Sequence, residues 1–191
     1  MRLLINIAIA VAIAAVIGFA TAWYAVDRGF LFGAISVGPW EAWPRAGSPD
    51  ADPYSIARLA RTGEVPLGAG EGLAFTAIAD QDGMPLAGNC DYRLDGQTPA
   101  ARLWTLTAYD GSGRLMANAA RRTGFHSREI LRRLDGSFAI SVSSEVHPGN
   151  WLPISTDGPF RLVFRLYDTP LTTGGEVSDT MMPRIVREAC R

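Results

Sequence analysis

The sequence predicts an all-β fold, an antiparallel β-sandwich or barrel with one short helix, preceded by an N-terminal transmembrane helix. Three observations predict this fold class. Apolar residues alternate with polar ones over several segments, Asp-Gly pairs separate those segments, and the chain begins with a long uncharged run. The spacing of the turns leaves no room for crossover helices, which excludes a parallel α/β sheet.

The composition excludes several classes of protein. The 191 residues are 48% hydrophobic and 19% charged with a formal net charge of −1, which excludes collagen-like, coiled-coil and strongly disordered chains. All 18 basic residues are arginine, so chemistry that needs a lysine amine is excluded. Because the chain has no excess of positive charge, the sequence does not predict nucleic-acid binding. Two histidines and two cysteines leave few ligands for a structural zinc site, and no motif predicts a metal or another cofactor.

Residues 1–26 are predicted to be a transmembrane anchor. Residues 3–26 carry no charge, and a helix of that length spans roughly 36 Å, more than a hydrocarbon core of about 30 Å. The alternative is a cleaved signal peptide, because residues 20–22 have the small-x-small form of a cleavage site. The positive-inside rule barely decides the orientation, since Arg2 precedes the span and Arg28 follows it. A short tail before a long domain favours export of that domain.

Residues 27–52 are predicted to be a connector rich in glycine, proline and tryptophan, without helical or strand periodicity. Its aromatic and apolar residues are too many for a freely solvated linker. We expect the stretch to pack on the domain or to lie at the membrane interface, through Phe30, Leu31, Phe32, Trp40 and Trp43.

Residues 53–191 are predicted to be the β-sandwich domain, which begins with the short helix. Asp52 is the expected N-cap and Gly63 the expected C-cap, and Pro53 suits the first helical position. The expected apolar stripe comprises Ile56, Leu59 and Ala60, opposite Arg58 and Arg61. Strands are expected over residues 73–80, 90–94, 102–109, 138–143 and 160–167, and turns at Asp82-Gly83, Asp95-Gly96, Asp110-Gly111 and Asp135-Gly136.

Cys90 and Cys190 are predicted to form a disulfide if the domain is exported. They are the only cysteines, and exported proteins seldom keep free thiols. The alternative is a buried small side chain at Cys90 and a free thiol at Cys190.

The sequence contains no recognised catalytic motif, so it does not reveal a reaction. Two groups of residues are candidates for ligand binding. His147, Asn150 and Trp151 lie in a loop that could stack on a sugar or an aromatic ligand, although Trp151 could equally close one end of the sandwich. Arg165 and Tyr167, together with Arg161 and Arg102, could form an anion cradle or a solvated charged face. Glu145 and His147 would lie on the same face of an extended segment, as a metal site would require. A solvated pair of side chains beside a turn explains the same two residues.

Several motifs resemble the bacterial family called domain of unknown function 1214. They are Gly88-x-Cys90-x-Tyr92-x-Leu94-x-Gly96, Arg102-x-Trp104-x-Leu106-Thr107-x-Tyr109-Asp110, Asp135-Gly136-Ser137, Gly149-Asn150-Trp151-Leu152-Pro153 and Arg165-Leu166-Tyr167. The chain resembles the short, anchored members, which lack the partner domain numbered 1254. The resemblance implies a jelly-roll-like β-sandwich, no known activity and no catalytic residues to carry over.

Together these observations predict a single-pass protein of the bacterial inner membrane with its C-terminal domain in the periplasm. We expect a non-catalytic binding or interaction module with a glycan or protein partner and no nucleic acid. The alternatives are a hydrolase-type enzyme that acts on an envelope glycan or small molecule, with a histidine beside a buried carboxylate in a pocket, and a purely structural assembly protein.

Overall fold

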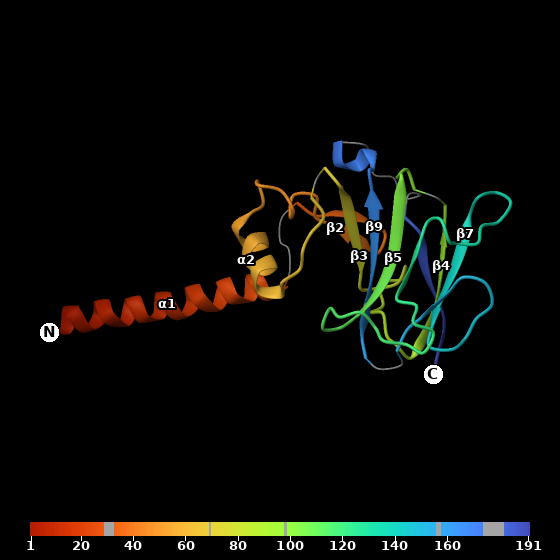
Figure 1. The fold of residues 1–191 in the computed structure, drawn as a ribbon. Helices are drawn as coiled ribbons and strands as arrows, with labels where there is room; N and C mark the ends of the chain where they lie inside the picture. The colour runs from red at the N-terminus through yellow and green to blue at the C-terminus, as the bar shows by residue number, and fades with distance from the viewer. Residues whose placement is uncertain (29–32, 69, 98, 156–157, 174–181) are drawn as a thin grey trace.

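The computed structural model describes residues 1–28, 33–68, 70–97, 99–155, 158–173 and 182–191. Among these residues, ten strands form two facing sheets, beside a long N-terminal helix and a short second helix (Figure 1). The six-stranded sheet has the order β1-β2-β3-β9-β5-β6, and the four-stranded sheet has the order β10-β4-β7-β8. The chain is therefore mostly β, as the alternating pattern predicts.

Every expected strand is present: residues 138–143 and 160–167 have the expected bounds, and the other three strands differ by one to three residues at an end. The six-stranded sheet comprises β1 (Ile35–Val37), β2 (Trp40–Ala42), β3 (Gly72–Ala77), β9 (Phe160–Tyr167), β5 (Leu103–Asp110) and β6 (Gly124–His126). The four-stranded sheet comprises β10 (Arg184–Cys190), β4 (Cys90–Gly96), β7 (Phe138–Ser143) and β8 (Trp151–Pro153). The helices are α1 (Arg2–Arg28), α2 (Pro53–Thr62) and the 3-10 turn η1 (Pro170–Thr173).

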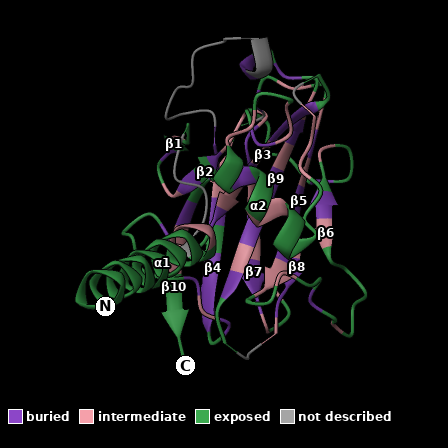
Figure 2. Ribbon diagram, turned by 90° about the vertical axis from the view of Figure 1, so that its left-hand side faces the viewer, coloured by how far each residue is buried: buried purple, intermediate pink, exposed green. Residues whose placement is uncertain are grey.

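The core lies between the two sheets. One face of β3, β4, β5, β7 and β9 is buried, as expected where alternate side chains point to opposite sides of a sheet (Figure 2). Trp104 of β5 packs against Phe138 of β7 with ring centroids 5.0 Å apart, and Tyr92 of β4 packs against Phe160 of β9 at 5.6 Å. These aromatic pairs join the two sheets.

Helix α1 is long and apolar enough to cross a membrane, and none of its most apolar stretch is buried in the protein. A signal sequence would have the same length and composition. Its C-terminal end contacts α2, where Arg61 pairs with Asp27 at 3.0 Å and its guanidinium lies 4.1 Å from the centre of the Trp23 ring. Helix α2 therefore lies beside the end of the apolar helix.

The ends of α2 agree with the sequence analysis. Asp52 is the N-cap and accepts hydrogen bonds from the backbone N–H groups of Tyr54 and Ser55, while Gly63 ends the helix in the left-handed conformation. The face that meets the sheet differs from the expected one. Ile56 is 54% exposed, and Arg58 and Leu59 turn instead toward the six-stranded sheet. A helix that covers a partly polar surface need not turn its most apolar stripe inward.

The structure places two strands in the stretch expected to be a connector without periodicity. Strand β2 pairs with β3, and Trp40 is fully buried with its indole N–H donating to the Pro183 carbonyl oxygen at 2.7 Å. Three-residue strands are too short to show an alternating pattern, so the sequence did not reveal them. Phe30, Leu31 and Phe32 lie outside the described residues.

Two further details correct the sequence analysis. Asp95-Gly96 is not a turn but the end of β4, where Gly96 lets the chain approach Pro183, since an added Cβ would lie 2.9 Å from the Pro183 Cβ. The sheets are not wholly antiparallel, because β7 and β8 pair in parallel. The loop between them returns the chain to the middle of β7 and places Trp151 beside Ser141.

The predicted disulfide between Cys90 and Cys190 is present. The two residues face each other in the antiparallel pairing of β4 with β10, so the bond fastens β10 to the edge of the four-stranded sheet. Arg191 adds an ion pair with Asp91 at 2.7 Å, and Arg187 pairs with buried Asp80 at 2.8 Å. The C-terminal strand is thus held by covalent and ionic contacts.

Candidate functional site

The outer face of the six-stranded sheet carries the candidate site. Val163 lies on that face of β9, between Thr76 of β3 and Thr107 of β5, yet it is only 5% exposed. A side chain that points away from the core is buried only if something else covers it. The cover is α2 with the residues that follow it, and a cavity remains between this cover and the sheet.

Two arginines of β9 form the floor of the cavity. Arg161 and Arg165 flank Val163 on the outer face because alternate residues of a strand point the same way. The pairing of β9 with β5 places Tyr109 opposite Arg161. Both guanidinium groups lie within 6 Å of the Tyr109 ring, and Arg165 donates a hydrogen bond to the Tyr109 hydroxyl at 3.1 Å. Cation–π contacts of this kind orient the guanidinium groups without neutralising them.

The turn after β5 positions Arg161. Asp110 accepts hydrogen bonds from the backbone N–H groups of Ser112 and Arg114 and from the Ser112 hydroxyl, and these bonds lower the pKa of Asp110 to about 2. The turn brings Gly113, at φ +81°, against the Arg161 guanidinium. A Cβ at Gly113 would lie 2.5 Å from an Arg161 nitrogen, so a side chain at this position would displace the arginine.

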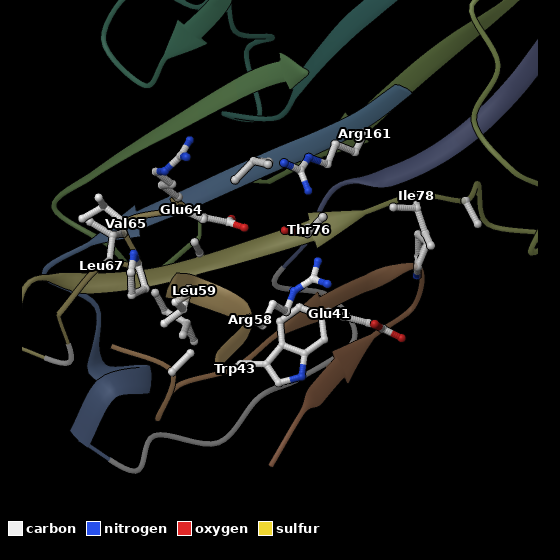
Figure 3. A pocket seen from close by; sticks show the side chains of 18 of the residues that line it. Glu41, Trp43, Arg58, Leu59, Glu64, Val65, Leu67, Thr76, Ile78 and Arg161 are labelled. Carbon is white, nitrogen blue, oxygen red and sulfur yellow. The ribbon is translucent and has the colours of Figure 1, made fainter. Parts of the chain in front are cut away.

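The opposite wall of the cavity comes from segments that precede β3 in the sequence. Arg58 and Leu59 of α2 and Trp43 after β2 line it, and Val65 and Leu67 continue it (Figure 3). Figure 3 shows Arg161 and Thr76 on the floor of the cavity and Arg58 extending into it from the opposite wall. Leu59, Val65 and Leu67 gather at one end, beside Glu64, whose carboxylate points toward Thr76, so the lining has a cationic part and a largely apolar part with one carboxylate.

The cavity has a volume of about 470 Å³, within the range of about 300–1,000 Å³ that is usual for small-molecule sites. A second hollow of about 460 Å³ adjoins it and shares Arg58, Arg161 and Arg165. The glutamates of the lining, Glu41 and Glu64, are both exposed, whereas the three arginines are half-buried. The buried part of the cavity is therefore cationic.

Within the part of the chain that the structure describes, the two floor arginines have no carboxylate partner. Among the described residues, neither Arg161 nor Arg165 forms an ion pair within 4.0 Å, and the Nε atom of Arg161 is buried without a hydrogen-bond acceptor. A half-buried guanidinium without a counterion is electrostatically favourable for an anion. The arrangement can hold an anionic group by paired N–H donors.

The structure separates the residues that the sequence analysis grouped as an anion cradle. Arg161 and Arg165 share the cavity, but Arg102 precedes β5 and pairs with Asp168 at 3.2 Å, with three quarters of its side chain exposed. Tyr167 lies at the opposite end of β9 from Arg161, beside Leu103, and lines neither hollow. Tyr109 was not predicted as the aromatic partner, although its position in an alternating strand places it on the same face as its alternate neighbours along the strand.

The other candidate group lies in the four-stranded sheet, away from the cavity. The Asn150 side chain is buried and donates to the carbonyl oxygens of Leu131 and Ala139, while it accepts from the Leu131 N–H. Trp151 is half-buried and donates to the Ser143 carbonyl oxygen at 3.0 Å. These bonds brace the loop between β7 and β8. His147 is half-buried in the same loop and lines neither hollow.

Among the residues that the structure describes, neither histidine meets a buried carboxylate. The side chains of His126 and Glu129 approach to 3.5 Å, but both are nearly half exposed. Glu145 lies after the end of β7 and contacts Arg191 at 3.1 Å. Within the described residues, no three side chains of His, Cys, Asp or Glu come close enough to hold a metal ion.

The fold and site define a two-sheet β domain with an N-terminal apolar helix and a cationic cavity under a short helix. Residues 71–171 match the family described as "Protein of unknown function (DUF1214)". The match covers more than half of the chain, so the chain belongs to this family. The floor of the cavity lies within the matched residues, whereas Trp43, Arg58 and Val65 precede them.

Solved structures with a similar fold include the crystal structure of the VPA0106 protein from Vibrio parahaemolyticus. It superposes with a TM-score of 0.60 at 24% sequence identity, over 76% of this chain and 37% of that protein. A putative uncharacterized protein from Burkholderia cenocepacia has a TM-score of 0.47 at 18% identity, over 91% of this chain and 50% of that one. The chain thus spans half or less of either protein. No curated protein matches the chain.

Proposed function

We propose that the chain is a membrane-anchored, non-catalytic binding module of the bacterial envelope, and that its binding site is the arginine cavity under α2. The observation that carries this proposal is the pair Arg161 and Arg165, half-buried on the cavity floor without a carboxylate partner among the described residues. Burying cations without counterions is costly, so a site that keeps them suits an anionic ligand. The ligand class is a small anion or an acidic sugar.

The proposed location rests on two features. Residues 1–26 would be the anchor in the inner membrane and residues 53–191 the exported domain, joined by residues 27–52. The Cys90–Cys190 disulfide supports export to the periplasm, because disulfides persist in oxidising compartments.

We also propose a jelly-roll-like sandwich, which is supported by a chain that passes from one sheet to the other between β3 and β4, β4 and β5, and β8 and β9.

A ligand screen with the full chain in non-ionic detergent tests the proposal. Phosphate, sulfate, citrate, and neutral and acidic envelope sugars are added during thermal unfolding. A ligand at 100 times its dissociation constant adds about 2.7 kcal/mol and raises the Tm of a chain of this size by about 5–10 °C. The increase should disappear in Arg161→Gln and persist in Arg102→Gln, a control arginine outside the cavity. An increase that is equal in both variants, or a shift by neutral sugars alone, would refute the proposed site.

A further inference from the structure

The cavity lies on the side of the domain from which α1 extends. Figure 2 looks at that side, and α2 crosses the six-stranded sheet there with exposed residues toward the viewer. The contacts of Arg61 with Asp27 and Trp23 hold α2 beside the C-terminal end of α1. If α1 spans the bilayer, α2 and the cavity beneath it lie close to the membrane surface.

Apolar side chains continue from the cavity to its mouth. Val65 and Ile78 both line the cavity, and they are 90% and 67% exposed. Ile56, on the exposed face of α2, is also largely uncovered. Such residues are costly to leave in water but favourable beside hydrocarbon. A ligand that is only a small anion would leave this apolar part of the cavity unused.

The cationic and apolar parts have the arrangement that an amphiphile needs. Arg161 and Arg165 lie on the sheet side of the cavity. Leu59, Val65 and Leu67 form the largely apolar end, beside Glu64 (Figure 3). The glutamates do not cancel the charge, because both are exposed and their fields are screened by solvent. A bound anionic group would therefore contact guanidinium groups, while an attached chain would contact Leu59, Val65 and Leu67.

We propose that the cavity binds an anionic amphiphile, a single carboxylate or phosphate head on an apolar chain, taken from the adjacent membrane. The head would accept hydrogen bonds from Arg161 and Arg165, and the chain would leave past Leu59, Val65 and Leu67 toward the bilayer. The inference rests on the proposed function, since it names the ligand class of the same site. No bond is made or broken in this binding.

Photocrosslinking in a bilayer tests the inference. The full chain is reconstituted in nanodiscs of zwitterionic phosphatidylcholine that contain a palmitic acid analogue with a diazirine in its chain. After illumination, tryptic peptides are quantified by mass spectrometry. The peptide 62–93 contains Val65 and Leu67, whereas the peptide 3–28 comes from α1 and reports general contact with lipid. The ratio of the two labels measures occupancy of the cavity.

The acid probe should label peptide 62–93 several times more than the matched fatty-alcohol probe, which has no charge. Arg161→Gln should reduce that ratio about tenfold, because a charge-assisted contact is lost, and Arg102→Gln should leave it unchanged. Val65→Glu, at an exposed position where the fold tolerates change, should reduce labelling by placing a charge beside the chain. If a phosphate-headed lysolipid displaces the acid probe, the site accepts both carboxylate and phosphate head groups. If it does not displace the probe, the site accepts carboxylates only.

Equal labelling by the acid and the alcohol, or labelling unaffected by Arg161→Gln, would overturn the inference. The thermal screen separates this failure from failure of the proposed function. If phosphate or citrate raises the Tm of the wild type but not of Arg161→Gln, the cavity still binds anions, and only the inference that the ligand is an amphiphile is wrong. If neither experiment detects binding that depends on Arg161, both proposals fail.

Discussion

Arginines at the β4–β10 edge and arginines under α2 meet opposite surroundings. At the edge, Arg187 pairs with Asp80 and Arg191 pairs with Asp91, and the disulfide lies between the same strands. Under α2, Arg161 and Arg165 contact Tyr109 but no carboxylate among the described residues. Charges that are neutralised within the chain stabilise its fold, whereas charges left without a partner remain available to a ligand. The same residue type therefore meets two different electrostatic environments.

Removing the disulfide should have the largest effect on stability. Cys190→Ser should lower the free energy of unfolding by about 2–4 kcal/mol, because the bond closes a long loop in the unfolded chain. Denaturant unfolding of the oxidised full chain measures this change. The reduced wild type should behave like the variant. Titration of two free thiols in the unreduced protein would contradict the assignment.

Arg187→Ala should have the next largest effect. Asp80 is 2% exposed, so removal of its partner leaves a buried carboxylate that, among the described residues, accepts hydrogen bonds from the backbone N–H groups of Asp82 and Met84 alone. We expect a loss of about 2 kcal/mol in equilibrium unfolding. Arg93→Ala is a matched control, because Arg93 pairs with Asp95 and Glu188 at an exposed site and should cost less than about 1 kcal/mol. Equal losses in the two variants would show that burial of the partner does not matter.

Asp52→Ala should loosen the cover of the cavity. The variant loses the N-cap bonds to Tyr54 and Ser55, at a cost of about 1 kcal/mol to α2. Hydrogen exchange measured by mass spectrometry should rise in the peptides of α2 and stay unchanged in those of β4 and β10. A uniform rise over the whole domain would mean that α2 and the sheets unfold together.

Arg161→Gln should barely change stability, in contrast to Arg187→Ala. The substitution removes a charge that has no ion-pair partner among the described residues, so the free energy of unfolding should change by less than about 0.5 kcal/mol. Thermal unfolding in a buffer without multivalent anions measures it. A decrease in the free energy of unfolding as large as that of Arg187→Ala would contradict this expectation and show that Arg161 has a structural role.

The smallest effect concerns Asp110, whose turn holds Gly113 against Arg161. Its hydrogen bonds to Ser112 and Arg114 lower its pKa from 3.8 to about 2 in the folded protein. A lowered folded pKa stabilises the fold above pH 3.8, and this contribution is lost as the pH falls toward 2. NMR titration of the Asp110 carboxyl should show a midpoint near 2, and Ser112→Ala should raise it. An ordinary midpoint would mean that the turn is open in solution.

The sequence predicted α1, α2 and the strands β3, β4, β5, β7 and β9, together with two residues of the candidate site. Alternation identified the long strands, and the residues at the helix ends identified α2, because both are local signals. Strand β10 was not predicted, because Ile185 is its only buried residue and the strand therefore has no alternating pattern. Arg161 and Arg165 were predicted to share an outward face. Arg58 and Trp43 were not linked to them, because α2 meets the sheet through contacts that are distant in sequence.

The pairing of β10 with β4 also affects how the chain folds during synthesis. The two cysteines are 100 positions apart, so β4 emerges long before the strand that completes its sheet. Until β10 arrives, one edge of β4 has unpaired backbone groups and Cys90 is a lone thiol. Such an edge can pair with another chain, and such a thiol can form a mixed disulfide. Premature release of the chain would therefore favour disulfide-linked aggregates, which a non-reducing gel separates from the native monomer.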